Sequence, residues 1–121
     1  MRKNIFGGFA SIPWTNFPKI WYSAPESFIF TLSNIYNTEP TKFPSKNDQC
    51  EVCHNYSCGP RFGLGRDSGV DGDILNSYNW SNFPNTYPDI LGKGKSIFTG
   101  DYNNNNSNSK IKEIEVFKIF K

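Results

Sequence analysis

The sequence predicts a mainly β protein. No segment of helix length keeps apolar residues at the spacing of one helix face. Prolines and glycines, 8 and 10 in number, interrupt nearly every candidate helix. The strongest apolar segment, Ser-Phe-Ile-Phe-Thr-Leu at residues 27–32, has the aromatic and β-branched content of a strand.

Length and charge limit the classes of function. A chain of 121 residues corresponds to one domain, residues 1–121, and its aromatic fraction of 17% can build a core from few large side chains. Lys and Arg outnumber Asp and Glu by only 13 to 11, so charge does not predict nucleic acid as a partner. The apolar runs are too short to span a bilayer and no signal-peptide core is recognisable, so we expect a soluble, cytoplasmic protein.

The first half of the chain contains four strand candidates. Residues 5–10 predict a strand that the glycines Gly7 and Gly8 kink or bring close to other backbone. The strand at 27–32 follows after a proline-rich loop. Between Asn37 and Cys58 the chain is polar, and residues 41–43 and 51–52 each predict a short edge strand.

The second half alternates turns with apolar segments. A glycine-rich stretch predicts sharp turns before a short strand at 73–75, and residues 76–88 predict a long loop held by aromatic anchors such as Phe83 and Tyr87. The Asn/Ser-rich run 103–109 predicts a solvated loop insertion. The apolar side chains in residues 111–120 alternate well enough to predict a terminal strand. Because this strand is apolar on both faces, we expect it to lie inside a sandwich of two sheets.

The cysteine cluster is the most conspicuous group of candidate ligands, and its members are Cys50, Cys53, His54 and Cys58. These residues have the softness that zinc prefers, but adjacent Cys53 and His54 would hardly reach one tetrahedral ion together. Cys-x-x-Cys-His also matches c-type haem attachment, yet Met1 is the only methionine and no export segment precedes the cluster. We therefore expect reduced thiols and no cofactor, with a zinc or redox module as the alternative.

Two groups of carboxylates are further candidates. Asp67, Asp71 and Asp73 lie among glycines as in a calcium loop, but Gly69 and Tyr78 fall where ligands belong, so an exposed acidic turn is expected. Glu113 and Glu115 share one face of the predicted last strand, which suits a hydrolase or, as we favour, two exposed charges. His54 is the only histidine and no nucleophile elbow is present, so we predict that the chain is not an enzyme.

The order of several short motifs resembles that of the TLDc family. Gly7 and Gly8 followed by Pro13 and Trp14 resemble the family's glycine pair and proline-tryptophan turn. Residues 27–32 resemble its next core strand, and Asp73-Ile74 its later short strand. The Gly-Pro-x-Phe-Gly motif is formed here by Gly59, Pro60, Phe62 and Gly63, and Glu115 lies in a segment similar to the closing strand.

The resemblance implies a non-catalytic protein-interaction module whose fold is a two-sheet antiparallel β-sandwich with short flanking helices. Family members are intracellular proteins linked to oxidative-stress protection, and several bind the vacuolar proton-pumping ATPase, so a subunit of that enzyme is the expected partner. The motif residues are expected to serve backbone geometry and sheet closure. Family domains carry elements before the glycine pair, so the chain corresponds to the C-terminal part of the domain, and an N-terminally incomplete sandwich is one outcome.

Overall fold

The computed structural model describes residues 4–13, 21–47, 49–53, 61–63, 67–71, 78–100, 108–111, 113, 115 and 117. Within these residues the chain forms nine strands and one short helix, in the order β1 (Ile5–Phe9), β2 (Trp21–Tyr22), β3 (Phe28–Ser33), β4 (Thr41–Pro44), β5 (Val52–Cys53), β6 (Arg61–Phe62), β7 (Ser68–Asp71), β8 (Tyr78–Trp80), α1 (Ser96–Thr99) and β9 (Asn108–Lys110). The expected mainly β class is confirmed.

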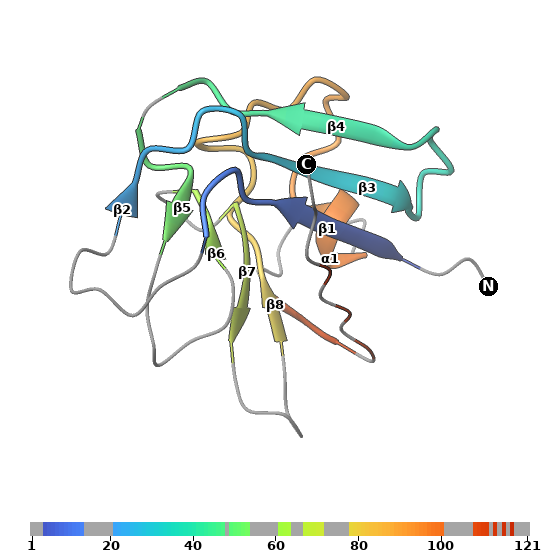
Figure 1. Ribbon diagram of the computed structural model, residues 1–121. Helices are drawn as coiled ribbons and strands as arrows, with labels where there is room; N and C mark the ends of the chain where they lie inside the picture. Colours follow the sequence, from blue (N-terminus) through green and yellow to red (C-terminus); the bar gives the residue numbers. More distant parts are fainter. Residues whose placement is uncertain are drawn as a thin grey trace.

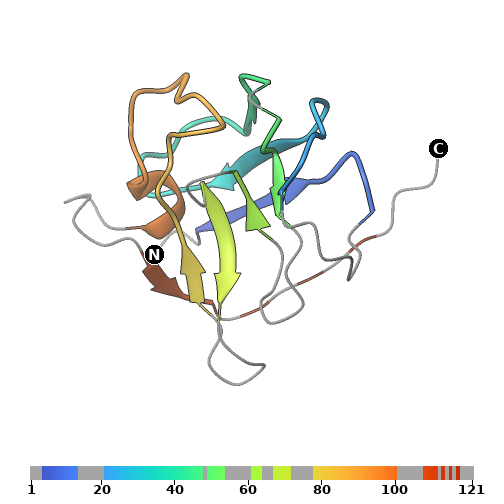
Figure 2. The ribbon, with the colours of Figure 1, turned by 90° about the vertical axis from the view of Figure 1, so that its left-hand side faces the viewer.

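The strands make two antiparallel sheets. The small sheet has the order β1-β3-β4, and the large sheet has the order β2-β5-β6-β7-β8-β9. In Figure 1 the strands of the small sheet run across the upper part of the view, at a steep angle to the strands of the large sheet below and to the left. Figure 2 shows α1 at one end of the sandwich, beside β8. The predicted two-sheet sandwich is therefore confirmed, with α1 as the short flanking helix of the described residues.

The small sheet follows the expected alternation of strand side chains. In β3, Ile29 and Thr31 are fully buried, whereas Phe28 and Phe30 on the other face are half-buried. The strand predicted at 27–32 is confirmed with a shift of one residue at each end. Strand β4 lies at an edge as predicted, but β5 lies between β2 and β6, so the edge position expected for residues 51–52 is wrong.

The core between the sheets is mainly aromatic. Phe43 of β4 meets Phe83 and Phe98 edge-on, with ring centroids 4.9 and 5.7 Å apart, and Phe83 meets Phe98 at 4.9 Å. Edge-to-face pairs of this kind add to the free energy gained by burying the rings. Phe83 and Tyr87 are 3% and 0% exposed, which confirms their predicted role as anchors. Strand β8, however, forms inside the segment expected as loop.

The sequence did not predict α1 because four residues are too few to show a helical period. Its C-terminus is closed by Gly100, whose φ of 77° is left-handed and whose N–H donates to the Ser96 carbonyl over 2.9 Å. Phe98 faces the core from this turn, where it also meets Phe6 of β1. The helix therefore joins the start of the chain to the aromatic core.

The glycine pair of β1 permits close packing. A Cβ at Gly8 would lie 2.5 Å from Cε2 of Phe62, and a Cβ at Gly7 would lie 2.7 Å from Cζ of Phe30. The glycines do permit a close approach, but by an aromatic side chain in each case and not by other backbone as expected. The irregularity in the β1-β3 register falls between Ile5 and Phe6, not at the glycines as the kink prediction placed it.

The C-terminal segment differs from its prediction. Asn108 and Ser109, the last residues of the expected Asn/Ser-rich loop, belong to β9 and pair with β8, while 103–107 lie outside the described residues. None of the described residues between 111 and 117 is in a strand, and Phe117 is 74% exposed. The interior strand predicted over 111–120 is therefore wrong for these residues, because β9 takes the place beside β8 instead.

Candidate interaction surface

The cysteine cluster is only partly described. Cys50 is half-buried, Cys53 is buried in β5, and neither forms a disulfide. His54 and Cys58 lie outside the described residues. Within the described part of the chain, no three Cys, His, Asp or Glu side chains gather in a way that could hold a metal ion. The two described cysteines thus do not form a ligand set with any other described residue.

The motif residues that the structure describes serve packing and backbone geometry. Gly7 and Gly8 accommodate aromatic rings, and Phe62 is 6% exposed in β6. Pro13 and Glu115 are exposed, as is Glu113. Trp14, Gly59 and Pro60 lie outside the described residues, and so does Asp73.

Asp67 is buried, which corrects the exposed acidic turn expected for it. Its side chain is fully inaccessible and accepts three backbone N–H groups of residues 85–87. Asn85 N lies 2.7 Å from Oδ2, Thr86 N lies 3.0 Å from Oδ1, and Tyr87 N lies 3.0 Å from Oδ2. The carboxylate therefore binds a segment of its own chain, which a buried acid needs in order to be tolerated.

The titration of Asp67 reflects two opposing causes. Burial raises the pKa of the carboxyl above its ordinary value of 3.8, because the charged form has lost its hydration. The N–H groups of Tyr87, Thr86 and Asn85 lower the pKa by bonding to the charged form, and burial outweighs them. Asp67 is consequently a structural acid whose charge opposes folding while its hydrogen bonds order the chain.

Glu51 is a second buried carboxylate, and it was not singled out from the sequence. Oε1 accepts the Ala24 N–H over 2.7 Å, and Oε2 lies 3.2 Å from both Ser45 Oγ and Gln49 N. The Glu51 carbonyl accepts the Tyr87 hydroxyl over 2.8 Å. Tyr87 thereby connects the backbone of Glu51 with the carboxylate of Asp67.

Asp89 organises the next part of the same loop. Its Oδ1 accepts the N–H groups of Leu91 and Gly92 over 3.1 and 2.8 Å, and its Oδ2 accepts the N–H of Gly94 over 2.7 Å. Side chains that bond to the following backbone in this way fix turns locally. Two carboxylates therefore fix the backbone within residues 81–95. Asp67 binds the residues just before Pro88, and Asp89 binds residues after it.

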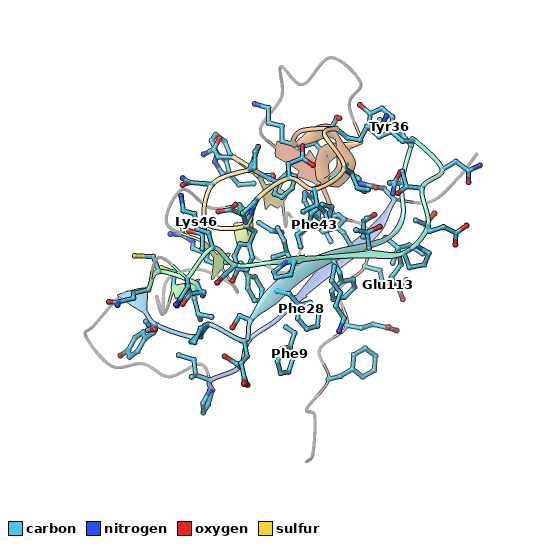
Figure 3. All side chains as sticks on the ribbon, turned by 90° about the horizontal axis from the view of Figure 1, so that it is seen from above. Phe9, Phe28, Tyr36, Phe43, Lys46 and Glu113 are labelled. Carbon is cyan, nitrogen blue, oxygen red and sulfur yellow. The ribbon has the colours of Figure 1, made fainter. Side chains whose placement is uncertain are left out.

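Tyr36 attaches this loop to the small sheet. Its hydroxyl lies 2.5 Å from Ser96 Oγ, which itself donates to the Lys93 carbonyl over 2.8 Å. The Lys93 ammonium lies 5.0 Å from the centre of the Tyr36 ring, within range of a cation–π interaction. In Figure 3 Tyr36 lies beside α1, and Lys46 lies toward the other end of the face of the small sheet that α1 covers.

The ordered loop carries an exposed apolar residue next to basic ones. Ile90 is 62% exposed, Lys93 is exposed, and Lys95 is half-buried. Lys95 also lines a shallow hollow of about 320 Å³, together with Asn82, Phe83 and Gly94. We call Ile90, Lys93, Lys95 and this hollow the loop surface. It is a candidate site for contact with another molecule.

A second apolar area lies on the outer face of the small sheet. Figure 3 shows Phe9 and Phe28 on the side of the sheet opposite to Phe43. Phe9 and Phe28 stack with ring centroids 5.3 Å apart, and the Lys42 ammonium lies 4.5 Å from the centre of the Phe28 ring. These side chains pack against one another, so this outer face is less exposed than Ile90.

The structure also bears on whether a helix of this chain could cross a membrane. The helix α1 has four residues, and the described part of the chain contains no helix that could span a bilayer.

Comparison with known proteins supports the family suggested by the motifs. The family model of the TLDc domain matches residues 1–120. Comparisons with curated proteins and with solved structures gave no match. The matched range covers both sheets and the loop surface. The chain therefore belongs to the TLDc domain family.

Proposed function

We propose that the chain is a non-catalytic TLDc interaction module that acts by binding a protein partner through the loop surface. The observation that supports this most strongly is the ordering of residues 81–95. Asp67 and Asp89 accept six backbone N–H groups of this segment between them, three each. A surface that is already ordered loses little conformational entropy when it binds.

The arrangement of the carboxylates favours binding over catalysis. Asp67 and Glu51 are fully buried, and their oxygens accept hydrogen bonds from the chain's own backbone and Ser45. A general acid or base has to reach a substrate atom, and neither group lines the hollow beside Lys95, whose lining residues are Asn82, Phe83, Gly94 and Lys95. Glu113 and Glu115 are exposed, as two surface charges would be.

Family membership suggests the partner. The TLDc resemblance implies oxidative-stress protection in the cytoplasm and, in several members, binding to the vacuolar proton-pumping ATPase. We propose the same role and compartment for this chain. The loop surface offers an apolar side chain near charged ones, which suits a protein contact with an apolar centre and a polar rim.

The test is a binding measurement with purified vacuolar ATPase. We expect the full chain to co-elute with the ATPase in size-exclusion chromatography and the Ile90→Asp variant to co-elute less. Ile90 is exposed, so this variant should keep the thermal unfolding midpoint of the wild type. Absence of co-elution by the wild type would contradict the proposed partner.

The proposed lack of catalysis needs its own control. Purified wild type and a variant with Glu113→Gln and Glu115→Gln are incubated with generic ester and phosphate-ester substrates. We expect equal background rates, because solvent-exposed carboxylates should not accelerate hydrolysis. Hydrolysis by the wild type that disappears in the variant would favour the hydrolase interpretation.

A further inference from the structure

We propose that two copies of this chain associate through the outer face of the small sheet, with Lys42 of each copy binding Glu113 and Glu115 of the other. This inference goes beyond the proposed function, because it concerns a different surface and a second copy of the chain. It follows from the apolar composition of the outer face, from its one charged side chain and from the side of the molecule on which Glu113 lies.

The outer face of the small sheet carries an apolar patch. Phe9, Phe28 and Phe30 are half-buried there, and the Phe28 ring centroid lies 5.3 Å from that of Phe9 and 6.2 Å from that of Phe30. Leu32 follows on the same face of β3 by the alternation of strand side chains, and it is 50% exposed. We call Phe9, Phe28, Phe30 and Leu32 the outer patch. Contiguous apolar side chains that are still partly exposed are suited to pack against another protein surface.

Exposed apolar surface continues beyond Leu32. Ile5 of β1 pairs with Ser33, the residue after Leu32, and is 44% exposed. In the described part of the chain four large apolar side chains are exposed, namely Ile5, Leu32, Ile90 and Phe117. Two of the four thus belong to this end of the small sheet.

Lys42 is the one charged residue within β1, β3 and β4, and it is exposed. Its ammonium lies 4.5 Å from the centre of the Phe28 ring, which places the cation at the outer patch. The ring takes up one side of an ammonium that has three N–H donors, so a carboxylate can bind Lys42 while the contact with the ring is kept. The outer face therefore suits a surface that combines apolar side chains with carboxylates.

The chain itself carries such a surface on the same side. In Figure 3 Glu113 lies on the side of the small sheet that carries Phe9 and Phe28, opposite to Phe43. Glu113 and Glu115 are both exposed, and Phe117 is 74% exposed. Four residues of extended chain span at most about 14 Å, so Phe117 stays within that distance of Glu113.

Within one copy these two parts do not cover each other. Leu32 of the outer patch is exposed, and so are Glu113, Glu115 and Phe117. A second copy related by a two-fold axis presents both parts again, so that each Lys42 meets the carboxylates of the other copy and each Phe117 meets the other outer patch. Symmetric dimers use surfaces of this self-complementary kind.

The loop surface stays free in such a dimer. The Lys93 ammonium lies over the ring of Tyr36, and in Figure 3 Tyr36 lies on the side of α1, away from Phe9 and Phe28. A dimer would therefore present two loop surfaces and would bind a partner with two sites more tightly than a monomer does.

The test is sedimentation velocity of the full chain over a range of concentrations. We expect the wild type to change from monomer to dimer with a dissociation constant of about 10 µM, because the outer patch is small. Lys42→Glu should weaken the dimer about tenfold or more, since it places carboxylates opposite carboxylates. Leu32→Asp should weaken the dimer as well, because it puts a charge into the outer patch.

Lys46→Glu is the matched control for charge. Lys46 is an exposed lysine on the other face of the small sheet, where its N–H donates to the Thr86 carbonyl over 2.9 Å. This variant has the same net charge as Lys42→Glu, and we expect it to dimerise like the wild type. Circular dichroism and thermal unfolding of each variant show whether it is folded.

Mixing two charge variants tests the contact between copies. The Glu113→Lys, Glu115→Lys double variant should dimerise poorly alone, because its lysines face Lys42 of the second copy. Mixed with Lys42→Glu, it should form a heterodimer about as stable as the wild-type dimer, since each acidic group then meets a lysine on the other copy. A contact inside one copy would give no such recovery on mixing.

Three results would overturn the proposal. They are a wild type that stays monomeric up to about 200 µM, an equal loss of dimer in Lys42→Glu and Lys46→Glu, and a mixture that does not form the heterodimer. The co-elution experiment with the vacuolar ATPase concerns the loop surface on the other side, so each of these results leaves the proposed function standing.

Discussion

Gly63 and Asp67 lie so close together that a Cβ on Gly63 would overlap Oδ1 of Asp67. Gly63 also has a φ of 92°, in the region that favours glycine, and its N–H donates to the Glu51 carbonyl over 3.0 Å. One residue of the Phe-Gly motif thus contacts both buried acidic residues. The glycine is needed for its lack of a side chain and for its backbone conformation.

Replacing Gly63 should destabilise the protein more than replacing another glycine of positive φ. In Gly63→Ala the new Cβ clashes with Asp67 and the backbone is strained, so we expect a loss of about 3 kcal/mol or more in the free energy of unfolding. Gly92 has a φ of 71° and nothing within 4 Å of its Cβ position. Gly92→Ala should cost about 1 kcal/mol, measured like the first by urea denaturation, and equal losses would contradict the steric explanation.

Asp67 should make stability depend on pH in an unusual direction for an acid. Because burial raises its pKa, the folded state binds the proton more tightly than the unfolded state does. The stabilisation is fully present below the ordinary value of 3.8 and is lost as pH rises through the raised pKa. The difference in unfolding free energy between wild type and Asp67→Asn should therefore shift against the wild type as pH rises above 3.8.

Part of the difference in unfolding free energy between wild type and Asp67→Asn does not depend on pH. The amide of Asp67→Asn has one oxygen for three backbone donors, so we expect a loss of about 1–3 kcal/mol at low pH, where the native acid is protonated or nearly so. Urea denaturation at several pH values measures both components. A wild type that gains stability relative to the variant as pH rises would show that the N–H bonds outweigh burial.

The two glycines of β1 should respond differently to the same substitution. Gly8 faces Phe62, which is 6% exposed in the core, whereas Gly7 faces Phe30, which is half-buried on the outer face. Phe30 has room to move and Phe62 does not. We expect Gly8→Ala to cost about 2–3 kcal/mol and Gly7→Ala about 1 kcal/mol or less, by thermal or urea unfolding. The reverse order would contradict the packing described for β1.

Removing metal should leave the fold unchanged. The described cysteines Cys50 and Cys53 form no disulfide, and we predict that the whole cluster, with His54 and Cys58, binds no structural zinc. Elemental analysis of protein purified without added metal should give far less than one zinc per chain, and EDTA should not change the unfolding midpoint. Zinc near one equivalent that survives dialysis would support the alternative of a zinc module.

The local sequence pattern was sufficient to predict the strands of the small sheet. In β3 the aromatic and β-branched residues show the strand directly, and the prolines near Thr41 mark β4 as an edge. The order of glycine, proline and aromatic motifs was sufficient for the family. These features lie within a few residues of one another, so a single sequence reveals them.

The burial of Asp67 and Glu51 depends on contacts between residues far apart in the sequence, which the local sequence pattern does not reveal. Asp67 lies among glycines and polar residues, which suggested exposure, but its partners are backbone groups about 20 residues later at Tyr87. Glu51 likewise bonds to Ala24, far earlier in the chain. The alternation at 111–120 suggested a strand, yet β9 forms just before it, because pairing with β8 is decided by tertiary contacts.

The preformed loop surface is tested most directly by hydrogen exchange of the free protein, read at individual amides by NMR. We predict that the amides of Gly92 and Gly94 are protected about tenfold or more, because Asp89 accepts both. In Asp89→Ala this protection should disappear, while the amide of Ile29 in β3 keeps its own. If Gly92 and Gly94 in the wild type exchange as fast as in the variant, the loop is not ordered before binding and the proposed surface is contradicted.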